Sequence, residues 1–241
     1  MLKQQIRWGL LILMWISANT FAQTFKEWQD PNVNEVKRLP MHTDFFVYET
    51  QQLASVGTKG KSANYLSLHG EWKFHFAEAS DKRITGFWNT SWNDTTWDTM
   101  PVPGMWELNG YGEPIYAGQD YAWKGWFESM PPVVPIAKNR IGSYRRWFEI
   151  PSEWKGKDII LHFGSVTSCV YLWVNGKFVG YGEDSKLGQE FDITRYVRPG
   201  ERNIVAFQIM RWCDGSYLED QDCFRYTGVA RDSYLYARNQ R

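Results

Sequence analysis

Four acidic side chains lie close together in one short segment of this chain, between aromatic residues. The segment spans residues 211–225 and reads RWCDGSYLEDQDCFR. Carboxylates at this density are expected to contact solvent, ions or a polar ligand, and aromatic rings beside them suit a sugar or another domain. The acids are Asp214, Glu219, Asp220 and Asp222, and the rings are those of Trp212, Tyr217 and Phe224. Charge patterning alone allows a simpler interpretation, a solvated acidic loop.

The acids do not make a convincing catalytic pair. In an extended segment only Asp220 and Asp222 would share a face, with Glu219 turned away, and nothing else in the sequence supports general acid and base roles. The histidines show neither an HExxH pattern nor paired spacing, so we expect structural or surface roles for them. They are His42, His69, His75 and His162. The sequence contains no serine nucleophile elbow or phosphate-binding glycine loop. We therefore expect no autonomous active site.

Charge and cysteine content exclude further function classes. The chain carries 27 basic and 27 acidic residues, so it lacks the net positive charge that favours nucleic acid or an anionic membrane. Its three cysteines fit no zinc-ligand spacing. Cys213 and Cys223 flank the acids, and two states remain open for them: a disulfide in an oxidising compartment, or buried free thiols.

Residues 1–22 have the pattern of a secretory signal peptide. The basic residues Lys3 and Arg7 are followed by an apolar run from Trp8 to Ile16, and Thr20-Phe21-Ala22 ends the segment. The apolar stretch is far shorter than the ~20 residues of a membrane span, and no later segment is long enough. We therefore expect a secreted or periplasmic protein with no membrane span.

The rest of the sequence divides into an extension and one domain. Residues 23–62 carry scattered apolar residues and end in a polar glycine turn, and residues 63–241 are expected to form a single β domain. Apolar–polar alternation, continuous apolar runs and the NG turn at 175–176 predict its strands. These strands are 72–76, 143–150, 158–163, 170–174, 177–181, 203–210 and 233–236. Short strands with Gly and Pro turns favour an all-β antiparallel β-sandwich.

Two aromatic-rich stretches, residues 87–97 and 111–127, allow two interpretations. They can pack at the edges and loops of the sandwich, as aromatic clusters commonly do. They can also form a platform for sugar rings or for a neighbouring domain. The sequence leaves both open.

Several short motifs occur in an order that resembles the N-terminal sugar-binding domain of glycoside hydrolase family 2 β-galactosidases. SYLEDQD at 216–222 is one of them, and the others extend the resemblance over nearly all of residues 27–236. They are WQDP (28–31), RLPMH (38–42), VPGMW (102–106), GYGEPIY (110–116), GSYRR (142–146), WVNG (173–176), VGYGEDS (179–185), EFD (190–192) and GVARD (228–232). Each motif alone is a weak signal, whereas their shared order and spacing make a strong one.

The resemblance implies a galactose-binding-like jelly-roll sandwich and, for the whole enzyme, hydrolysis of terminal β-D-galactosides. Retaining glycosidases use two carboxylates about 5 to 5.5 Å apart, and in this family those glutamates lie in a downstream (β/α)8 barrel. The sequence stops at Arg241, where the sandwich ends. We therefore expect this chain to lack the barrel and to be inactive alone. Its implied partners are a β-galactoside and the catalytic barrel, as a domain or a subunit.

The resemblance also implies roles for individual acids. Asp222 stands where the family's sandwich domain contacts galactose in the barrel's pocket and helps to hold a monovalent cation, Na⁺ or K⁺. A carboxylate suits both roles because it accepts from hydroxyls and binds hard cations; the alternative is a buried acid that caps the turn. Asp214 stands where some members hold a structural Mg²⁺. Asp30 and Glu183 stand where those members use Asn and Gln.

Two departures from the family pattern bear on sugar preference. Gly118 stands where some members place a substrate-contacting Asn, and Cys223-Phe224 follows Asp222 where an apolar residue and Trp are common. The main hypothesis is the sugar-binding domain of a secreted β-galactosidase. The alternatives are a free-standing carbohydrate-binding module and a purely structural interaction domain.

Overall fold

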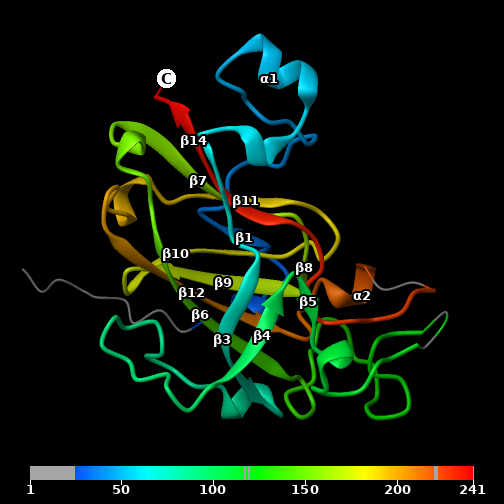
Figure 1. Ribbon diagram of the computed structural model, residues 1–241. Coiled ribbons are helices and arrows are strands. Elements are labelled where there is room, and N and C mark those ends of the chain that lie inside the picture. Colours follow the sequence, from blue (N-terminus) through cyan, green and yellow to red (C-terminus); the bar gives the residue numbers. More distant parts are fainter. Residues whose placement is uncertain (1–24, 117, 119, 220–221, 241) are drawn as a thin grey trace, which may run out of the picture.

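Strands dominate the computed structural model, which describes residues 25–116, 118, 120–219 and 222–240. Every strand pair within these residues is antiparallel, and the helical segments are short. They are α1 (Gln51–Val56), α2 (Ser216–Glu219), η1 (Glu27–Gln29), η2 (Lys59–Lys61), η3 (Ser80–Lys82), η4 (Glu107–Asn109), η5 (Ser152–Trp154) and η6 (Thr194–Tyr196), where η marks a 3₁₀ turn. The predicted all-β antiparallel sandwich is confirmed (Figure 1). The predicted signal peptide, residues 1–22, lies outside the described residues.

Two larger sheets and one small sheet make up the domain. The first has the strand order β1 (Glu35–Val36), β10 (Lys177–Gly182), β9 (Cys169–Val174), β12 (Arg202–Met210), β6 (Ile141–Glu149), β3 (Gly70–Ala77) and β4 (Asp98–Val102). The second has the order β11 (Gln189–Asp192), β7 (Lys157–Phe163), β14 (Ser233–Asn239) and β2 (Tyr65–Ser67). The small sheet has the order β5 (Gly104–Met105), β13 (Gly228–Val229) and β8 (Val166–Thr167).

The main hydrophobic core joins the two larger sheets. Phe207 of β12 stacks on Tyr144 of β6 with ring centroids 4.4 Å apart, and it meets Phe163 of β7, from the other sheet, at 5.2 Å. Trp72 and Phe74 of β3 belong to the same core, as the predicted alternation required. The core therefore fixes the strands whose connecting loops carry the candidate site.

The outward faces of both larger sheets are covered as well. Above the seven-stranded sheet, the ring of Trp88 stacks on Trp173 of β9 with centroids 4.6 Å apart. Above the four-stranded sheet, Phe46 of the N-terminal extension packs against Tyr234 of β14. A strand covered on both faces needs apolar side chains on both, and β9 is accordingly buried at every position.

The hairpin predicted at Asn175-Gly176 is present. Both residues adopt positive φ, 49° and 81°, as two-residue hairpin turns require, and Val174 pairs with Lys177. Asn175 also accepts a hydrogen bond from the backbone N–H of Ile204 through its side-chain oxygen. The turn is thus tied to the neighbouring strand β12.

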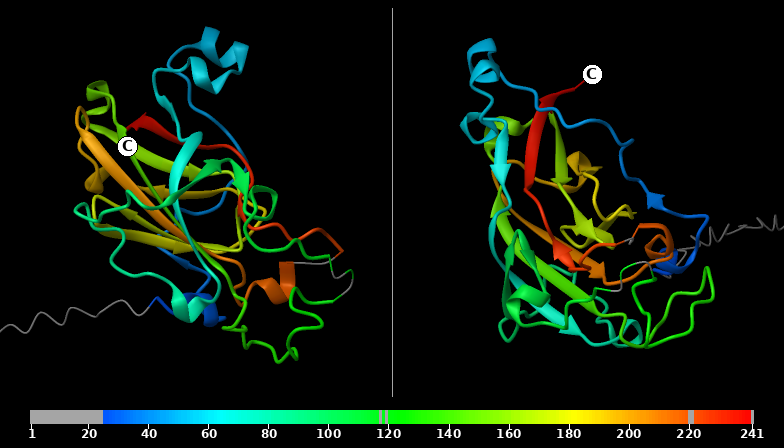
Figure 2. Two further views of the ribbon diagram at one scale, coloured as in Figure 1. Left: turned by 60° about the horizontal axis from the view of Figure 1, so that its bottom comes forward. Right: turned by 90° about the vertical axis from the view of Figure 1, so that its right-hand side faces the viewer.

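Residues 25–62 run along the sandwich from η1 near one end to α1 at the other (Figure 2). On the way, β1 pairs with β10, and the N–H of Leu39 donates to the carbonyl oxygen of Glu190. Helix α1 was not predicted; the Thr50 side chain caps its start and Gly57 ends it in the left-handed conformation. None of the described helices is long and apolar enough to cross a membrane.

Candidate functional site

Asp222 lies on an exposed loop where two distant segments meet. Its Oδ1 accepts a hydrogen bond of 2.8 Å from the hydroxyl of Tyr116, and its N–H donates to the carbonyl oxygen of Gly118 at 2.9 Å. Its φ of 49° turns the chain, and Arg225 then forms a β-bridge with Ile115. Because Asp222 is exposed, the alternative of a buried capping acid does not hold. Its second carboxylate oxygen accepts from no other described residue and is open to a ligand.

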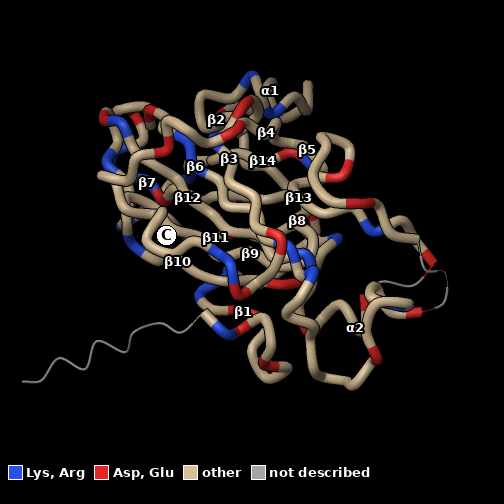
Figure 3. Tube along the Cα trace, turned by 90° about the horizontal axis from the view of Figure 1, so that it is seen from below, with Lys and Arg blue, Asp and Glu red and all other residues tan. Residues whose placement is uncertain are grey.

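An apolar surface flanks this carboxylate. Phe224, 61% exposed, packs on Tyr116, 58% exposed, with ring centroids 5.0 Å apart. Leu218 on α2 is 91% exposed, and α2 with its adjoining loops projects at one end of the molecule (Figure 3). We call this surface the loop face. It comprises the exposed side chains of Tyr116, Met130, Val133, Leu218 and Phe224.

The three aromatic rings of residues 211–225 lie in different environments. Phe224 reaches the surface, as described above. Trp212 is buried against Trp123, with ring centroids 5.5 Å apart. Tyr217 is half-buried and donates to the carbonyl oxygen of Val133, which joins α2 to the loop beneath it. Trp212 therefore belongs to the core, and Phe224 is the ring best placed to meet a ligand or a partner.

Asp30, Glu183 and Asp214, which the sequence grouped as weaker candidates, come together. The N–H of Asp214 donates to the carbonyl oxygen of Trp28 at 3.0 Å, which brings the turn containing Asp30 alongside. The carboxyl groups of Glu183 and Asp214 lie close enough for each to shift the pKa of the other, and Tyr181 donates a hydrogen bond to Glu183. The structure thus assembles this acidic cluster from the extension, the end of β10 and the acidic segment.

Glu219 also joins the cluster, which was not predicted. The expectation of an extended segment was wrong at this point, because Ser216–Glu219 forms the helical turn α2. Glu219 accepts from the backbone N–H of Ser185 at 3.2 Å and from its hydroxyl. The signal was present in the sequence, since S-x-x-E at 216–219 is a helix-starting pattern. Asp220, the fourth acid, lies outside the described residues.

Burial and like charge perturb the acidic cluster. Burial, with the charges of Asp214 and Glu219 acting in the same direction, raises the pKa of Glu183 to about 8. Burial likewise raises the pKa of Asp214, and the charge of Asp30 adds to the effect. At neutral pH, Glu183 therefore holds a proton, which lessens the repulsion between its carboxyl group and that of Asp214.

The donor chemistry of the acidic cluster fits Mg²⁺ in part. Mg²⁺ prefers oxygen ligands, and Asp214 has a buried oxygen, Oδ1, without a hydrogen-bond partner among the described residues. Among the same residues, no three His, Cys, Asp or Glu side chains are arranged to hold a metal ion. Mg²⁺ is commonly bound through one or two carboxylates with water as the remaining ligands. The cluster fits that mode and not an all-protein cage.

The three cysteines are free thiols, so the disulfide alternative for Cys213 and Cys223 is not found. Cys213 is fully buried, whereas Cys223 is half-buried on the loop. Burial raises the pKa of the Cys213 thiol well above its usual range, which keeps it protonated and unreactive.

A second polar cluster fastens the extension to the four-stranded sheet. The carboxylate of Glu190 lies 3.0 Å from Nε2 of His42 and 3.0 Å from Nδ1 of His162, and it accepts from the hydroxyl of Tyr236 at 2.9 Å. Burial opposes its charge, but these hydrogen bonds outweigh burial and lower the pKa of Glu190. Hydrogen bonds to the Thr43 carbonyl and to Glu190 raise the pKa of His42. Both histidines thus have the structural role expected from the sequence.

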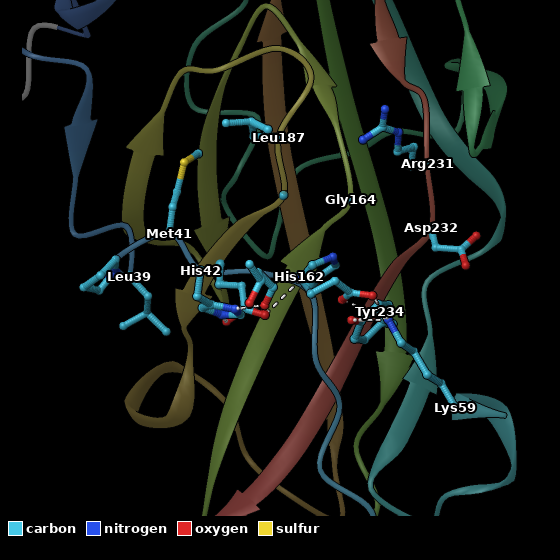
Figure 4. A pocket seen from close by; sticks show the side chains of 15 residues that line it. Leu39, Met41, His42, Lys59, His162, Gly164, Leu187, Arg231, Asp232 and Tyr234 are labelled. Carbon is cyan, nitrogen blue, oxygen red and sulfur yellow. Dashed lines mark hydrogen bonds and ion pairs between the residues drawn. The ribbon is translucent and has the colours of Figure 1, made fainter. Parts of the chain in front are cut away.

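This cluster lies at the floor of a cavity of about 850 Å³ (Figure 4). Met41 and Leu187 line one side, and Lys59 and Asp232 line the other. The charged groups are largely paired within the protein: Lys59 contacts Asp44 at 3.2 Å, and Asp232 contacts a histidine at 3.3 Å. We interpret the cavity as a joint between the extension and the sheet, because few of its polar groups remain for a ligand.

Comparison with known proteins gives two consistent results. Residues 65–239 match the family described as "Glycosyl hydrolases family 2, sugar binding domain". A β-galactosidase of Priestia megaterium is 40% identical over 220 residues, which cover 91% of this chain and 21% of the relative. The "Beta-galactosidase large subunit" of Leuconostoc lactis is 34% identical over 86% of this chain and 34% of its own length. The chain therefore spans about a fifth to a third of these relatives.

Solved structures show the same fold at lower identity. A β-glucuronidase of Bacteroides uniformis superimposes with a TM-score of 0.54 and 21% sequence identity, over 73% of this chain and 18% of that chain. At this identity the likeness shows the fold alone.

Proposed function

The chain belongs to the family 2 glycosyl hydrolases, and from this relationship we propose that it is the sugar-binding domain of a secreted β-galactosidase. In this proposal the sandwich has jelly-roll connectivity of the galactose-binding kind. Asp222 completes a galactose site whose other residues, including the catalytic carboxylates, come from a (β/α)8 barrel. The barrel is a further domain or a separate subunit, so this chain alone hydrolyses no β-galactoside.

One observation carries the proposal: Asp222 is exposed beside an apolar surface. Tyr116 and Phe224 are exposed and in contact, Leu218 is exposed six residues before Phe224 in the chain, and exposed apolar patches commonly mark sites of interaction. An open carboxylate oxygen at the rim of such a patch suits a sugar hydroxyl held between two protein parts. The loop face is therefore the expected contact with the barrel.

We also propose two cations for the assembled enzyme. Asp222 would supply one oxygen ligand to Na⁺ or K⁺ at the sugar site. Glu183 and Asp214, with Asp30 nearby, would hold a hydrated Mg²⁺, whose charge offsets the repulsion within the acidic cluster. The chemistry that each ion supplies is positive charge: at the sugar site it polarises bound oxygen, and in the acidic cluster it stabilises the fold.

Export is the remaining part of the proposal. Cleavage after Ala22 would leave Gln23 as the first residue of a secreted or periplasmic protein. Mass spectrometry of protein from the exported fraction tests this directly. An intact Met1 in soluble protein would overturn it.

A hybrid enzyme tests the main proposal. In this hybrid, the matching residues of the Priestia megaterium β-galactosidase are replaced by those of this chain, starting at Phe25. We expect the hybrid to hydrolyse a nitrophenyl β-galactoside, whereas this chain alone and the relative without its matching residues do not. The control is a second hybrid, in which the same residues are replaced by the matching domain of another family 2 β-galactosidase. If that control is active, a soluble, folded hybrid of this chain without activity would contradict the proposal.

A further inference from the structure

We propose that an aromatic cleft at the edge of the seven-stranded sheet is a separate binding site for neutral pyranosides. The cleft lies beside β3 and the edge strand β4, between that edge and the loop of residues 84–97, and its volume is about 580 Å³. A volume of this order accommodates one or two sugar rings. None of the residues assigned above to the galactose site, the acidic cluster or the joint lines this cleft. The inference therefore stands independently of the proposed function.

Four half-buried aromatic side chains line the cleft: Phe76, Trp92, Trp97 and Tyr111. Trp97 meets the ring of His75 with centroids 5.5 Å apart, so its position is fixed by a neighbour on β3. Fully buried rings would belong to the core, but these rings retain exposed area at a concave surface. A pyranose presents C–H groups on its ring faces, and aromatic rings in a cleft are the surface on which such faces pack.

Polar groups with unused hydrogen-bonding capacity surround these rings. Asp98 accepts from the hydroxyl of Tyr111 at 2.8 Å through Oδ2, and its Oδ1 accepts from no described residue. Asn93 accepts twice from Thr95 through Oδ1, which holds the amide in place while its nitrogen donates to no described residue. The exposed hydroxyl of Thr96 also has no described partner. An amide donor, a hydroxyl and a carboxylate acceptor match the mixed donors and acceptors on a sugar rim.

Two ring nitrogens in the same lining lack partners. Nδ1 of His75 and Nε1 of Trp92 are buried, and no described residue hydrogen-bonds with either. Native proteins rarely leave such atoms unpaired, because each unpaired group disfavours the folded state. Both atoms belong to residues that line the cleft, and a small movement of these side chains would have to expose them before a sugar hydroxyl, or a water that bridges to it, could satisfy them.

The charge of the cleft selects among sugars. Asp98 is the one charged side chain among the residues that line it in the described structure, and Lys73 nearby contacts the carbonyl oxygen of Trp97 from outside the lining. Because Lys73 lies outside the lining, a uronic acid would bring its carboxylate into a cleft whose described lining carries only the negative charge of Asp98. The cleft therefore favours neutral pyranosides such as galactosides and glucosides over glucuronides.

The test is a titration of the chain from Phe25 onwards, followed through its indole N–H resonances in NMR spectra. The probes are methyl β-D-galactopyranoside, methyl β-D-glucopyranoside and methyl β-D-glucuronide. We expect saturable shifts of the Trp92 and Trp97 resonances with at least one neutral glycoside, and binding at least tenfold weaker for the glucuronide. Shifts confined to residues around Asp222, or no shifts at all, would overturn the proposal.

Variants separate this site from the loop face. Trp97→Ala should weaken binding at least tenfold, and Thr96→Val, which removes one exposed hydroxyl at constant shape, about threefold. Leu218→Glu, which alters the loop face outside the cleft, should leave the affinity unchanged. If the Trp97→Ala variant does not fold, Thr96→Val still tests the site. Neutral-sugar binding that survives both cleft changes, or that disappears with Leu218→Glu, would place the sugar elsewhere.

Discussion

The hydroxyl of Tyr116 donates a 2.8 Å hydrogen bond to the carboxylate of Asp222 across 106 positions of sequence. Tyr116 ends the GYGEPIY motif and Asp222 ends SYLEDQD, so the contact joins two of the motifs that carried the family resemblance. The bond also raises the pKa of the Tyr116 hydroxyl, which therefore remains a donor over the working range of pH. Tyr116 is thus the side chain that positions the Asp222 carboxylate.

Replacing Tyr116 by Phe should lower kcat/KM of the hybrid enzyme about fivefold, because the hydrogen bond that orients the Asp222 carboxylate is lost. Tyr121→Phe is the matched control, since Tyr121 is also partly exposed on the neighbouring loop but makes no contact with Asp222. Steady-state kinetics with a nitrophenyl galactoside give the comparison. Equal activity of the two variants would show that Tyr116 does not position the Asp222 carboxylate.

The bond between His42 and Glu190 should make the stability of the chain depend on pH. The pKa of His42 is raised above 6.5, so its contribution is complete below pH 6.5 and is lost as the pH rises through the folded value. The pKa of Glu190 is lowered below 4.5, so its contribution is present above pH 4.5 and is lost on acidification. The joint between the extension and the sheet is therefore most stable between pH 4.5 and pH 6.5. His162, Tyr236 and Asp44 also face this pair.

Thermal melts between pH 5.5 and 8.5 check this expectation. The unaltered chain should lose more stability over that range than His42→Gln, in which the titrating group is absent. His69→Gln is the matched control, because His69 contacts Asp232 at 3.3 Å in an exposed pair and should behave like the unaltered chain. A His42→Gln variant with the full pH dependence would show that another group is responsible.

The loop face should make the isolated chain self-associate. Leu218→Glu places a charge at its most exposed side chain and should weaken self-association at least tenfold without changing the melting temperature. Val56→Glu at the end of α1 alters an exposed apolar residue far from the loop face and serves as control. Sedimentation velocity at several concentrations measures both. A chain that stays monomeric at every concentration would contradict the expectation.

Mg²⁺ should raise the melting temperature of the chain by about 3 °C when its concentration is about tenfold above the dissociation constant, through preferential binding to the folded state. Asp214→Asn removes the carboxylate with the unpartnered oxygen and should abolish the effect. Asp81→Asn, an exposed acid outside the acidic cluster, should leave it unchanged. The same shift with Na⁺ at matched ionic strength would instead indicate general screening.

The sequence predicted the strands well because their signals are local. The alternation of Trp72, Phe74 and Phe76 and the Asn175-Gly176 turn each depend on a few neighbouring residues, and each marks the strand or turn that the structure contains. Strand β4 (Asp98–Val102) was not predicted. It contains Pro101, and it lies at the sheet edge, where proline is tolerated and the pattern is weak.

The site was harder to predict because its contacts cross long distances. The family resemblance singled out Asp222 as a candidate site residue. The structure adds the two hydrogen bonds that hold it, with the Tyr116 hydroxyl and the Gly118 carbonyl oxygen. The grouping of Asp30, Glu183 and Asp214 also came from the resemblance. Glu219, the fourth member of the acidic cluster, was not predicted to join it, because residues 211–225 were expected to be extended. The S-x-x-E pattern at 216–219 predicts the start of a helix instead, and the structure forms α2 there.

The contribution of Asp222 to a galactosidase site is tested most directly by Asp222→Asn in the hybrid enzyme. This change keeps the size of the side chain and removes the charge that would hold the cation and accept from the sugar. We predict kcat/KM at least tenfold lower, with an unchanged melting temperature and with activity that no longer responds to Na⁺ or K⁺. An Asp222→Asn hybrid as active and as cation-dependent as its parent would contradict the assignment.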